Sequence, residues 1–168
     1  APLVHSIFAA KQMVTVDHIG HGRFGLNIVC GWNQDEFDMF GVAQREHDDR
    51  YAYGQEWWDV VSRIWSSHER FDFEGTYLKL KGVVGKPGPF GGTRPVLMNA
   101  GASAAGRTFG ARNCDFLFTL VADIENGGTV VNEIKRQAQG FGRDVDVLAT
   151  SYIVCRPTTK EAEDYHHY

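Results

Sequence analysis

Hydrophobic positions along the chain alternate between helical spacing and short continuous apolar runs. Apolar residues at helical spacing predict a helix over Ser6–Ile19, and the apolar run Phe24–Cys30 predicts a strand buried on both faces. A second helix is predicted to begin near His47, because aromatic and aliphatic residues line one side of the segment that follows. Residues 31–46 show no period and predict an irregular connection.

The pattern changes after the second predicted helix. Two short runs, Phe71–Phe73 and Tyr77–Lys81, flank Glu74-Gly75 and predict a hairpin. A stretch rich in glycine and proline follows as far as Pro95 and is typical of a loop. We therefore expect residues 71–95 to be an insertion within a single domain that spans residues 1–168.

Regular alternation of strands and helices returns after this segment. Strands are predicted at Val96–Asn99, Asp115–Leu120 and Val145–Cys155, and helices at Ser103–Arg112, at Thr129–Gln139 and from Thr159. This pattern predicts an α/β fold with a parallel sheet, which suits either a doubly wound sheet or part of a barrel. The first helix has no strand before it and the last has none after it, so we expect a partial chain.

Composition and charge narrow the classes of function. The chain carries 43% hydrophobic and 23% charged residues and a formal net charge of −4, with lysine and arginine scattered, so we expect no nucleic-acid partner. No apolar run reaches the roughly 20 residues that span a bilayer, and the first residues do not resemble a signal peptide. Cys30, Cys114 and Cys155 are far apart and fit reduced thiols in a cytoplasmic protein.

One amide side chain stands inside a predicted apolar strand. Asn27 lies on the same side of the strand as Gly25 and Val29, so we expect a buried carboxamide that needs a hydrogen-bond partner. A neighbouring backbone group or a bound ligand could supply that partner. Gly25 and Gly31 leave room for a flat ligand or another backbone to approach.

The turn Asn99-Ala100-Gly101-Ala102-Ser103 joins a predicted strand to a helix, with Ser103 at or near the N-cap. Its backbone N–H groups and the helix dipole could hold a phosphate, although an ordinary capped turn has the same pattern. Residues 46–51 place several polar side chains at a helix start, which fits a solvated first turn better than a metal site. No zinc-ligand spacing and no serine–histidine–acid arrangement is present, so we expect no metal.

These residues also carry a family resemblance. The chain resembles the luciferase-like flavin monooxygenases, in particular the branch that acts on pyrimidines, nitrilotriacetate, alkanesulfonates and dibenzothiophene sulfone. The resembling segments are Asp17–Ile19, Gly22–Trp32, Glu36-Phe37, His47, Arg50-Tyr51 and Met98–Gly106.

The resemblance implies part of a (β/α)8 barrel, about strands four to seven, that binds reduced FMN at the carboxyl ends of its strands. It implies that Asn27 faces the flavin and orients the flavin or oxygen, which makes it the catalytic candidate. The implied contacts with the cofactor come from Asn27, Glu36, His47, Arg50, Tyr51, Gly101 and Ser103.

The implied reaction transfers one oxygen atom from O2 to a small organic substrate, such as a pyrimidine or a related heterocycle. A separate NAD(P)H-dependent flavin reductase would supply the FMN, and the enzyme is expected to be a homo-oligomer. Thr150 and Tyr152 replace an arginine and a histidine of the sulfonate enzymes, which argues against a sulfonate substrate. The alternatives are a truncated flavin-binding protein without activity and a deazaflavin-dependent oxidoreductase on the same barrel.

Overall fold

The computed structural model describes residues 1–121, 123–150 and 153–167. Its helices are α1 Ser6–Ile19, α2 Gln34–Met39, α3 His47–Ser66, α4 Ala104–Asn113, α5 Ile124–Gly140 and α6 Thr159–His166, with a short 3-10 turn at Phe90–Gly92. Its strands are β1 Gly25–Asn27, β2 Phe71–Glu74, β3 Lys79–Val83, β4 Val96–Asn99, β5 Phe116–Leu120 and β6 Asp146–Thr150.

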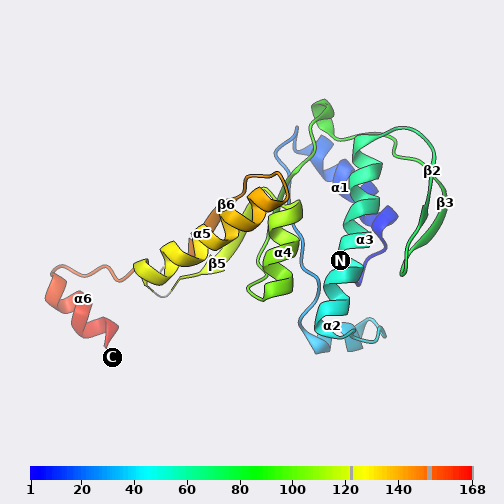
Figure 1. The fold of residues 1–168 in the computed structure, drawn as a ribbon. Coiled ribbons are helices and arrows are strands. Elements are labelled where there is room, and N and C mark those ends of the chain that lie inside the picture. Colours follow the sequence, from blue (N-terminus) through cyan, green and yellow to red (C-terminus); the bar gives the residue numbers. More distant parts are fainter. Residues whose placement is uncertain (122, 151–152, 168) are drawn as a thin grey trace.

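Four of the strands form one parallel sheet in the order β1-β4-β5-β6. Helices α3, α4 and α5 connect or follow these strands and pack on the same side of the sheet (Figure 1). A doubly wound sheet would carry helices on both faces, whereas a barrel carries them only on the outside. The structure therefore resolves the two alternatives in favour of a sector of a barrel.

Burial alternates along the strands in agreement with this arrangement. Leu97 and Leu117 face the helices and are fully buried, whereas Val96 and Leu120 point to the opposite face and are 48% and 72% exposed. The helix-covered face holds the core, and the opposite face, which is the inside of the barrel sector, is open.

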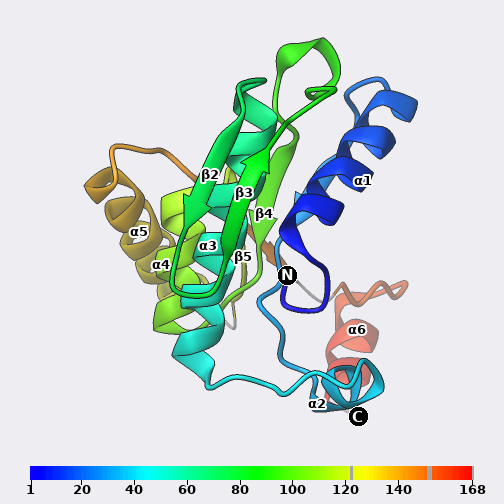
Figure 2. The ribbon, with the colours of Figure 1, turned by 90° about the vertical axis from the view of Figure 1, so that its right-hand side faces the viewer.

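The hairpin predicted at residues 71–81 is confirmed. Strands β2 and β3 pair as a separate two-stranded antiparallel sheet and lie along α3 (Figure 2). The carboxylate of Glu56 on α3 accepts hydrogen bonds from the backbone N–H groups of Thr76, Tyr77 and Leu78 at 2.7, 2.9 and 3.0 Å. That the whole segment 71–95 is an insertion stays a prediction.

The end of α1 holds the loop that leads to β4. Buried Asp17 accepts a hydrogen bond from the N–H of Phe90 at 2.8 Å, and His18 Nε2 lies 2.9 Å from the carbonyl oxygen of Gly88. The His18 and Phe90 rings also meet edge to face. The resembling segment Asp17–Ile19 thus serves here to fix a loop.

Two segments differ from the predicted elements. Residues 31–46 are not wholly irregular, because they contain α2, whose N-cap Asn33 accepts from the N–H of Asp35 at 3.1 Å. Helix α5 begins at Ile124 and not at Thr129, since Asp123 caps it and Gly127 and Gly128 continue the helix.

Two strands are shorter than predicted. Strand β1 covers only Gly25–Asn27 of the predicted run, and β6 covers Asp146–Thr150, whereas Ile153–Cys155 of the predicted run are not in a strand. Ser151 and Tyr152, which the sequence places in the same strand, lie outside the described residues. The three cysteines are free thiols, as predicted.

Candidate active site

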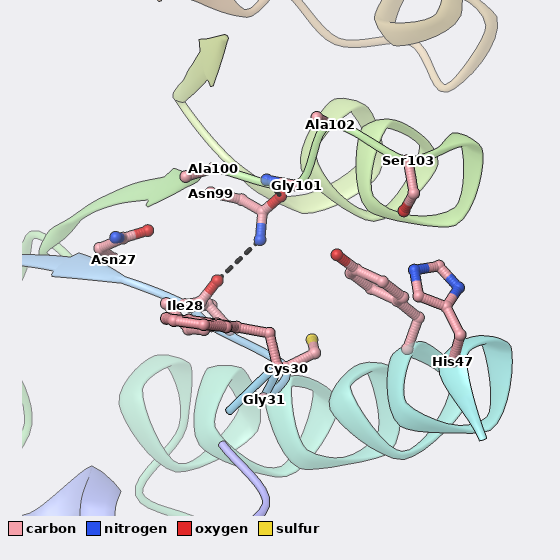
Figure 3. Close-up of a pocket in the computed structure, with 13 residues that line it drawn as sticks. Asn27, Ile28, Cys30, Gly31, His47, Asn99, Ala100, Gly101, Ala102 and Ser103 are labelled. Atoms are coloured by element: carbon pink, nitrogen blue, oxygen red, sulfur yellow. Dashed lines mark hydrogen bonds between the residues drawn. The ribbon is translucent and has the colours of Figure 1, made fainter. Parts of the chain in front are cut away.

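A pocket of about 440 Å³ opens at the carboxyl ends of β1 and β4 (Figure 3). Three segments line it: the end of β1 with residues 27–32, the turn after β4 with residues 99–103, and the first turns of α3 with His47 and Tyr51. The carboxyl ends of the strands are where barrel enzymes hold their reacting groups. Five predicted site residues meet here: Asn27, His47, Tyr51, Gly101 and Ser103.

Asn27 lines this pocket but is not buried, which corrects the sequence-based expectation. Strand alternation turns Leu26 and Ile28 toward the helices and Asn27 toward the open face, where no described residue accepts or donates a hydrogen bond to its amide. The prediction assumed a sheet covered on both faces. The carboxamide is therefore available to a ligand that enters from this face.

The turn after β4 has the conformation of a capped helix start, as predicted. Ser103 Oγ accepts a hydrogen bond from the N–H of Gly106 at 3.1 Å, and Arg107 Nε donates to the carbonyl oxygen of Ala102 at 2.9 Å. Within the described part of the chain, the N–H groups of Ser103, Ala104 and Ala105 meet no acceptor. The turn therefore presents unpaired donors at the positive end of α4.

Close packing of two glycines shapes this turn. A Cβ atom on Gly101 would lie 2.7 Å from Gly106 Cα and 2.7 Å from the Tyr51 hydroxyl oxygen, and one on Gly106 would meet the same hydroxyl at 2.7 Å. The absence of side chains lets the loop lie against the helix, with the Tyr51 hydroxyl packed on both glycines. Any larger residue would have to displace Tyr51 or open the turn.

The start of α3 brings the third set of side chains. The Tyr51 ring lies between the His47 and Phe109 rings, with centroid distances of 5.3 and 6.1 Å. Burial raises the pKa of the Tyr51 phenol, and a hydrogen bond with Ser103 opposes this effect. Tyr51 is therefore a neutral hydroxyl at pH 7 that can donate or accept a hydrogen bond.

Arg50 and Glu36 do not line the pocket with the other candidates. Burial raises the pKa of Tyr51 and of Cys30, and the positive charge of Arg50 partly opposes this rise, so Arg50 contributes to the electrostatics of the site. Glu36 is exposed on α2, and only Phe37 of that helix is buried. Of the predicted cofactor residues, Glu36 and Arg50 therefore stand outside the pocket wall, and of these two Arg50 acts on the site through its charge.

Cys30 is part of the pocket wall. Its sulfur lies where a side chain on Gly54 would be, at 2.6 Å from the position of a Cβ atom there. Burial raises the pKa of the Cys30 thiol to about 11, so that it stays protonated at pH 7 and acts as a small apolar side chain. Among the described residues, no group of three or more histidines, cysteines or acids could hold a metal ion.

Sequence reasoning missed the most buried polar residue of this site. Asn99, 2% exposed, donates from Nδ2 to the carbonyl oxygen of Ile28 at 2.7 Å and accepts from the N–H of Gly101 at 2.8 Å (Figure 3). Its position after the apolar residues of β4 was the available signal, since a buried amide at a strand end must find partners.

The geometry of this barrel sector agrees with comparisons to known proteins. Residues 1–168 match the family described as luciferase-like monooxygenase, and the chain belongs to that family. It is 34% identical over 155 residues to the FMNH2-dependent dimethylsulfone monooxygenase of Pseudomonas fluorescens (strain Pf0-1), covering 92% of this chain and 42% of the relative. It is 29% identical over 165 residues to the pyrimidine monooxygenase RutA of Enterobacter sp. (strain 638), covering 95% and 45%.

Solved structures support the same fold. A riboflavin lyase crystallised with modified FMN and riboflavin superposes with a TM-score of 0.89 at 28% identity, over 98% of this chain and 42% of that protein. A long-chain alkane monooxygenase gives a TM-score of 0.85 at 24% identity, over 96% and 43%. The chain thus spans less than half the length of these relatives, and its four-stranded sheet corresponds to part of their barrel.

No helix in the described ranges is long and apolar enough to cross a membrane.

Proposed function

We propose that this chain supplies the FMN-binding part of an FMNH2-dependent two-component monooxygenase. The observation that carries the proposal is the pocket at the ends of β1 and β4, which brings together Asn27, His47, Tyr51, Gly101 and Ser103. These residues come from three separate segments of a chain that belongs to a flavin monooxygenase family. When bound, reduced FMN supplies the electrons and the activation of O2.

The turn after β4 fits the phosphate of FMN. Unpaired N–H groups of Ser103, Ala104 and Ala105 and the positive end of the α4 dipole favour an anion. The absence of a side chain on Gly101 lets the turn pack against α4 and Tyr51. Ser103 Oγ adds a hydroxyl that can donate to a phosphate oxygen while it accepts from Gly106. Arg50 adds positive charge nearby.

The remaining residues of the pocket would orient the isoalloxazine ring and the substrate. Asn27 offers an amide donor and acceptor on the open face, and His47 and Tyr51 offer rings and polar atoms at its rim. The described lining contains no lysine, arginine, aspartate or glutamate, and burial raises the pKa of both Cys30 and Tyr51, so these two side chains are neutral at pH 7. This favours a small uncharged substrate, a description that fits both a pyrimidine and a dialkyl sulfone.

The partners follow from the reaction. A separate NAD(P)H-dependent flavin reductase would provide the reduced FMN, and O2 would be the second substrate. The relatives' names include dimethylsulfone and pyrimidine monooxygenases, so both molecules are candidates. We favour no single one of them, and we retain a homo-oligomeric assembly as a prediction.

Replacement of Ser103 by Asp tests the proposal. Aspartate is as good an N-cap as serine, so α4 should remain capped, but its carboxylate would stand against the phosphate. In the full-length protein with a flavin reductase and NADH, the wild type should oxidise dimethylsulfone or uracil, and Ser103→Asp should lose FMN binding and turnover.

The measurements are anaerobic titration of tryptophan fluorescence with reduced FMN, and product formation by mass spectrometry. Unchanged FMN affinity in Ser103→Asp would show that this turn does not bind the phosphate of FMN. A wild-type protein that binds FMN but oxidises no small organic molecule would favour the non-catalytic flavin-binding alternative.

A further inference from the structure

Asn99 occupies an unusual place at the end of a parallel strand pair. The N–H of Ile28 donates to the carbonyl oxygen of Met98 at 2.8 Å, which continues the ladder between β1 and β4 by one bond. In a regular parallel ladder the carbonyl oxygen of Ile28 would then accept from the N–H of Ala100. Here it accepts from Asn99 Nδ2 at 2.7 Å, so a side chain takes the place of the next backbone donor.

Because a side chain provides this hydrogen bond in place of the backbone, the chain can leave the sheet after Asn99. Once the Asn99 amide has satisfied Ile28, the backbone at Ala100 can turn toward α4 without leaving a buried carbonyl unpaired. The other end of the same carboxamide accepts from the N–H of Gly101 at 2.8 Å, which fixes where the turn begins. The two hydrogen bonds join the end of β1 to the turn.

The Gly101 hydrogen bond also determines which donors the turn presents. With its N–H directed back to Asn99, Gly101 packs its Cα against Gly106 and the Tyr51 hydroxyl. Among the described residues, the next unpaired N–H groups are those of Ala102, Ser103 and the first residues of α4. The position of these donors therefore depends on a contact made by a residue that is 2% exposed and whose amide is already engaged in two hydrogen bonds to the backbone.

We propose that Asn99 is a positioning residue for the phosphate of FMN, acting through Gly101 and the end of β1. The inference rests on the proposed function, since it assumes that the turn after β4 holds that phosphate. It concerns the phosphate, because the Asn99 side chain lies on the helix-covered face of β4 with Leu97, and its two hydrogen bonds go to the backbone of Ile28 and of Gly101.

Riboflavin provides the necessary comparison, because it has the ring and ribityl chain of FMN but no phosphate. Asn99→Leu keeps similar volume and removes both hydrogen bonds, which leaves the Gly101 N–H and the Ile28 carbonyl without their partner. The affinity for FMN should fall by about tenfold or more, and that for riboflavin should change by less than about threefold.

Asn113→Leu is the matched control. Asn113 is also buried, at 8% exposure, and also bridges two elements, since its Nδ2 donates to Gln55 Oε1 at 2.7 Å and to the Phe109 carbonyl oxygen at 2.9 Å. It lies at the opposite end of α4 from the turn. Its replacement should lower the melting temperature and leave the ratio of FMN to riboflavin affinity unchanged.

The experiment uses the full-length protein, with both flavins reduced under anaerobic conditions and titrated by tryptophan fluorescence, and with melting temperatures measured without flavin. If Asn99→Leu does not fold, Asn99→Ser should, because a water molecule in the vacated space can bridge the two backbone groups. Asn99→Ser should then lose a smaller part of the preference for FMN.

The outcomes separate this inference from the proposed function. Equal losses for FMN and riboflavin in the folded Asn99 variant, or no loss for either, would overturn the positioning role. The same selective loss in Asn113→Leu would overturn it as well. A wild-type protein that binds FMN no better than riboflavin would instead refute the proposal that the turn after β4 binds the phosphate.

Discussion

At the scale of residues, the site depends on positions where a side chain is absent. Gly101 and Gly106 touch through their Cα atoms, and the Tyr51 hydroxyl fills the remaining space. Because Tyr51 also packs on His47 and Phe109, a change at either glycine would be transmitted to the aromatic rim of the pocket. The glycine pair therefore links the geometry of the turn to that of α3.

Replacement of Gly101 by Ala should destabilise the protein. The new Cβ would lie 2.7 Å from both Gly106 Cα and the Tyr51 hydroxyl and 2.8 Å from Asn99 Oδ1. Such overpacking costs about 1–3 kcal/mol of unfolding free energy, to be measured by urea denaturation of the full-length protein.

Gly128→Ala is the control for this prediction. Gly128 lies in α5, is exposed, and would place its Cβ with no atom within 4 Å. Alanine in a helix is favoured over glycine by about 0.5–1 kcal/mol, so this variant should be slightly more stable than the wild type. Equal effects of the two substitutions would show that the turn is not closely packed.

The amide side chains show how far residue roles can be predicted from sequence. Asn27 and Asn99 both follow apolar residues of predicted strands, and the same argument requires a partner for each. The partner of Asn99 is Ile28, which is 71 positions away in the chain, and no local pattern reveals such a pair. Asn27, His47, Tyr51 and the turn, all named from the sequence, thus line one pocket, but the sequence did not show which of the two amides is buried.

At the scale of elements, two carboxylates of α3 hold the hairpin against that helix. Glu56 accepts three backbone N–H groups from residues 76–78, and Asp49 accepts a hydrogen bond from the Tyr77 hydroxyl. The Arg45 guanidinium lies over the Tyr53 and Tyr77 rings. These contacts surround the segment of α3 that carries His47 and Tyr51, so they stabilise the helix start that lines the pocket.

Glu56→Ala should release the hairpin turn. Three N–H groups would lose a charged acceptor, and hydrogen bonds to charged groups contribute about 1.5–3 kcal/mol. Hydrogen exchange at the amides of Thr76, Tyr77 and Leu78 should become faster, while exchange in the β5–β6 pair stays unchanged. Glu69→Ala is the control, because the Glu69 side chain makes no hydrogen bond to the described residues. Unchanged exchange in both variants would show that Glu56 does not hold the hairpin turn.

The elements themselves were largely predictable, and the exceptions share a cause. The long helices show apolar residues at helical spacing, and the buried strands and the hairpin show short apolar runs, so all of these elements are visible in the sequence. Helix α2 was missed because it is six residues long and buries only Phe37, which leaves no period to detect. Helix α5 begins at Ile124, before the predicted start at Thr129, because Asp123 caps it and the weak helix formers Gly127 and Gly128 lie within its first turns.

At the scale of the whole molecule, three strands of the sheet meet at Asp115. Arg94 binds its carboxylate through two nitrogens at 2.7 and 2.5 Å, the Leu97 N–H donates at 2.9 Å, and Arg143 lies at 3.5 Å. Burial disfavours the charged form of Asp115, but the hydrogen bonds from Arg94 and Leu97, with the positive charges of both arginines, outweigh it and lower the pKa.

This lowered pKa predicts part of the acid sensitivity. The unfolded chain binds a proton at Asp115 near pH 3.9, whereas the folded protein binds it only at lower pH, so the stabilisation is present above about pH 4 and is lost as the pH falls through the folded pKa. Asp115→Asn should reduce the unfolding free energy at pH 7 and flatten its decline below pH 4. The measurement is urea denaturation across pH 3–7, and an unchanged slope below pH 4 would contradict the assignment.

The 168-residue polypeptide itself has an open face and two open edges. Strands β1 and β6 form the ends of the four-stranded sheet, and its inner face exposes Val29, Val96, Leu120 and Leu148. The chain spans less than half of its relatives, in which a barrel has no free strand edges. Alone, these residues present unpaired strand edges and an exposed apolar face.

We therefore expect the isolated 168 residues to self-associate. Apolar side chains on the inner face and unpaired strand edges both favour contacts between copies. In a complete barrel, the remaining strands would cover this face and pair with these edges. Light scattering should show species larger than the 18.8 kDa monomer, increasing with concentration. Val96→Lys and Leu148→Lys, which place charges on the inner face, should reduce this association, whereas Lys160→Ala on α6 should not. A monodisperse monomer with a cooperative thermal transition would show that the sheet needs no further cover.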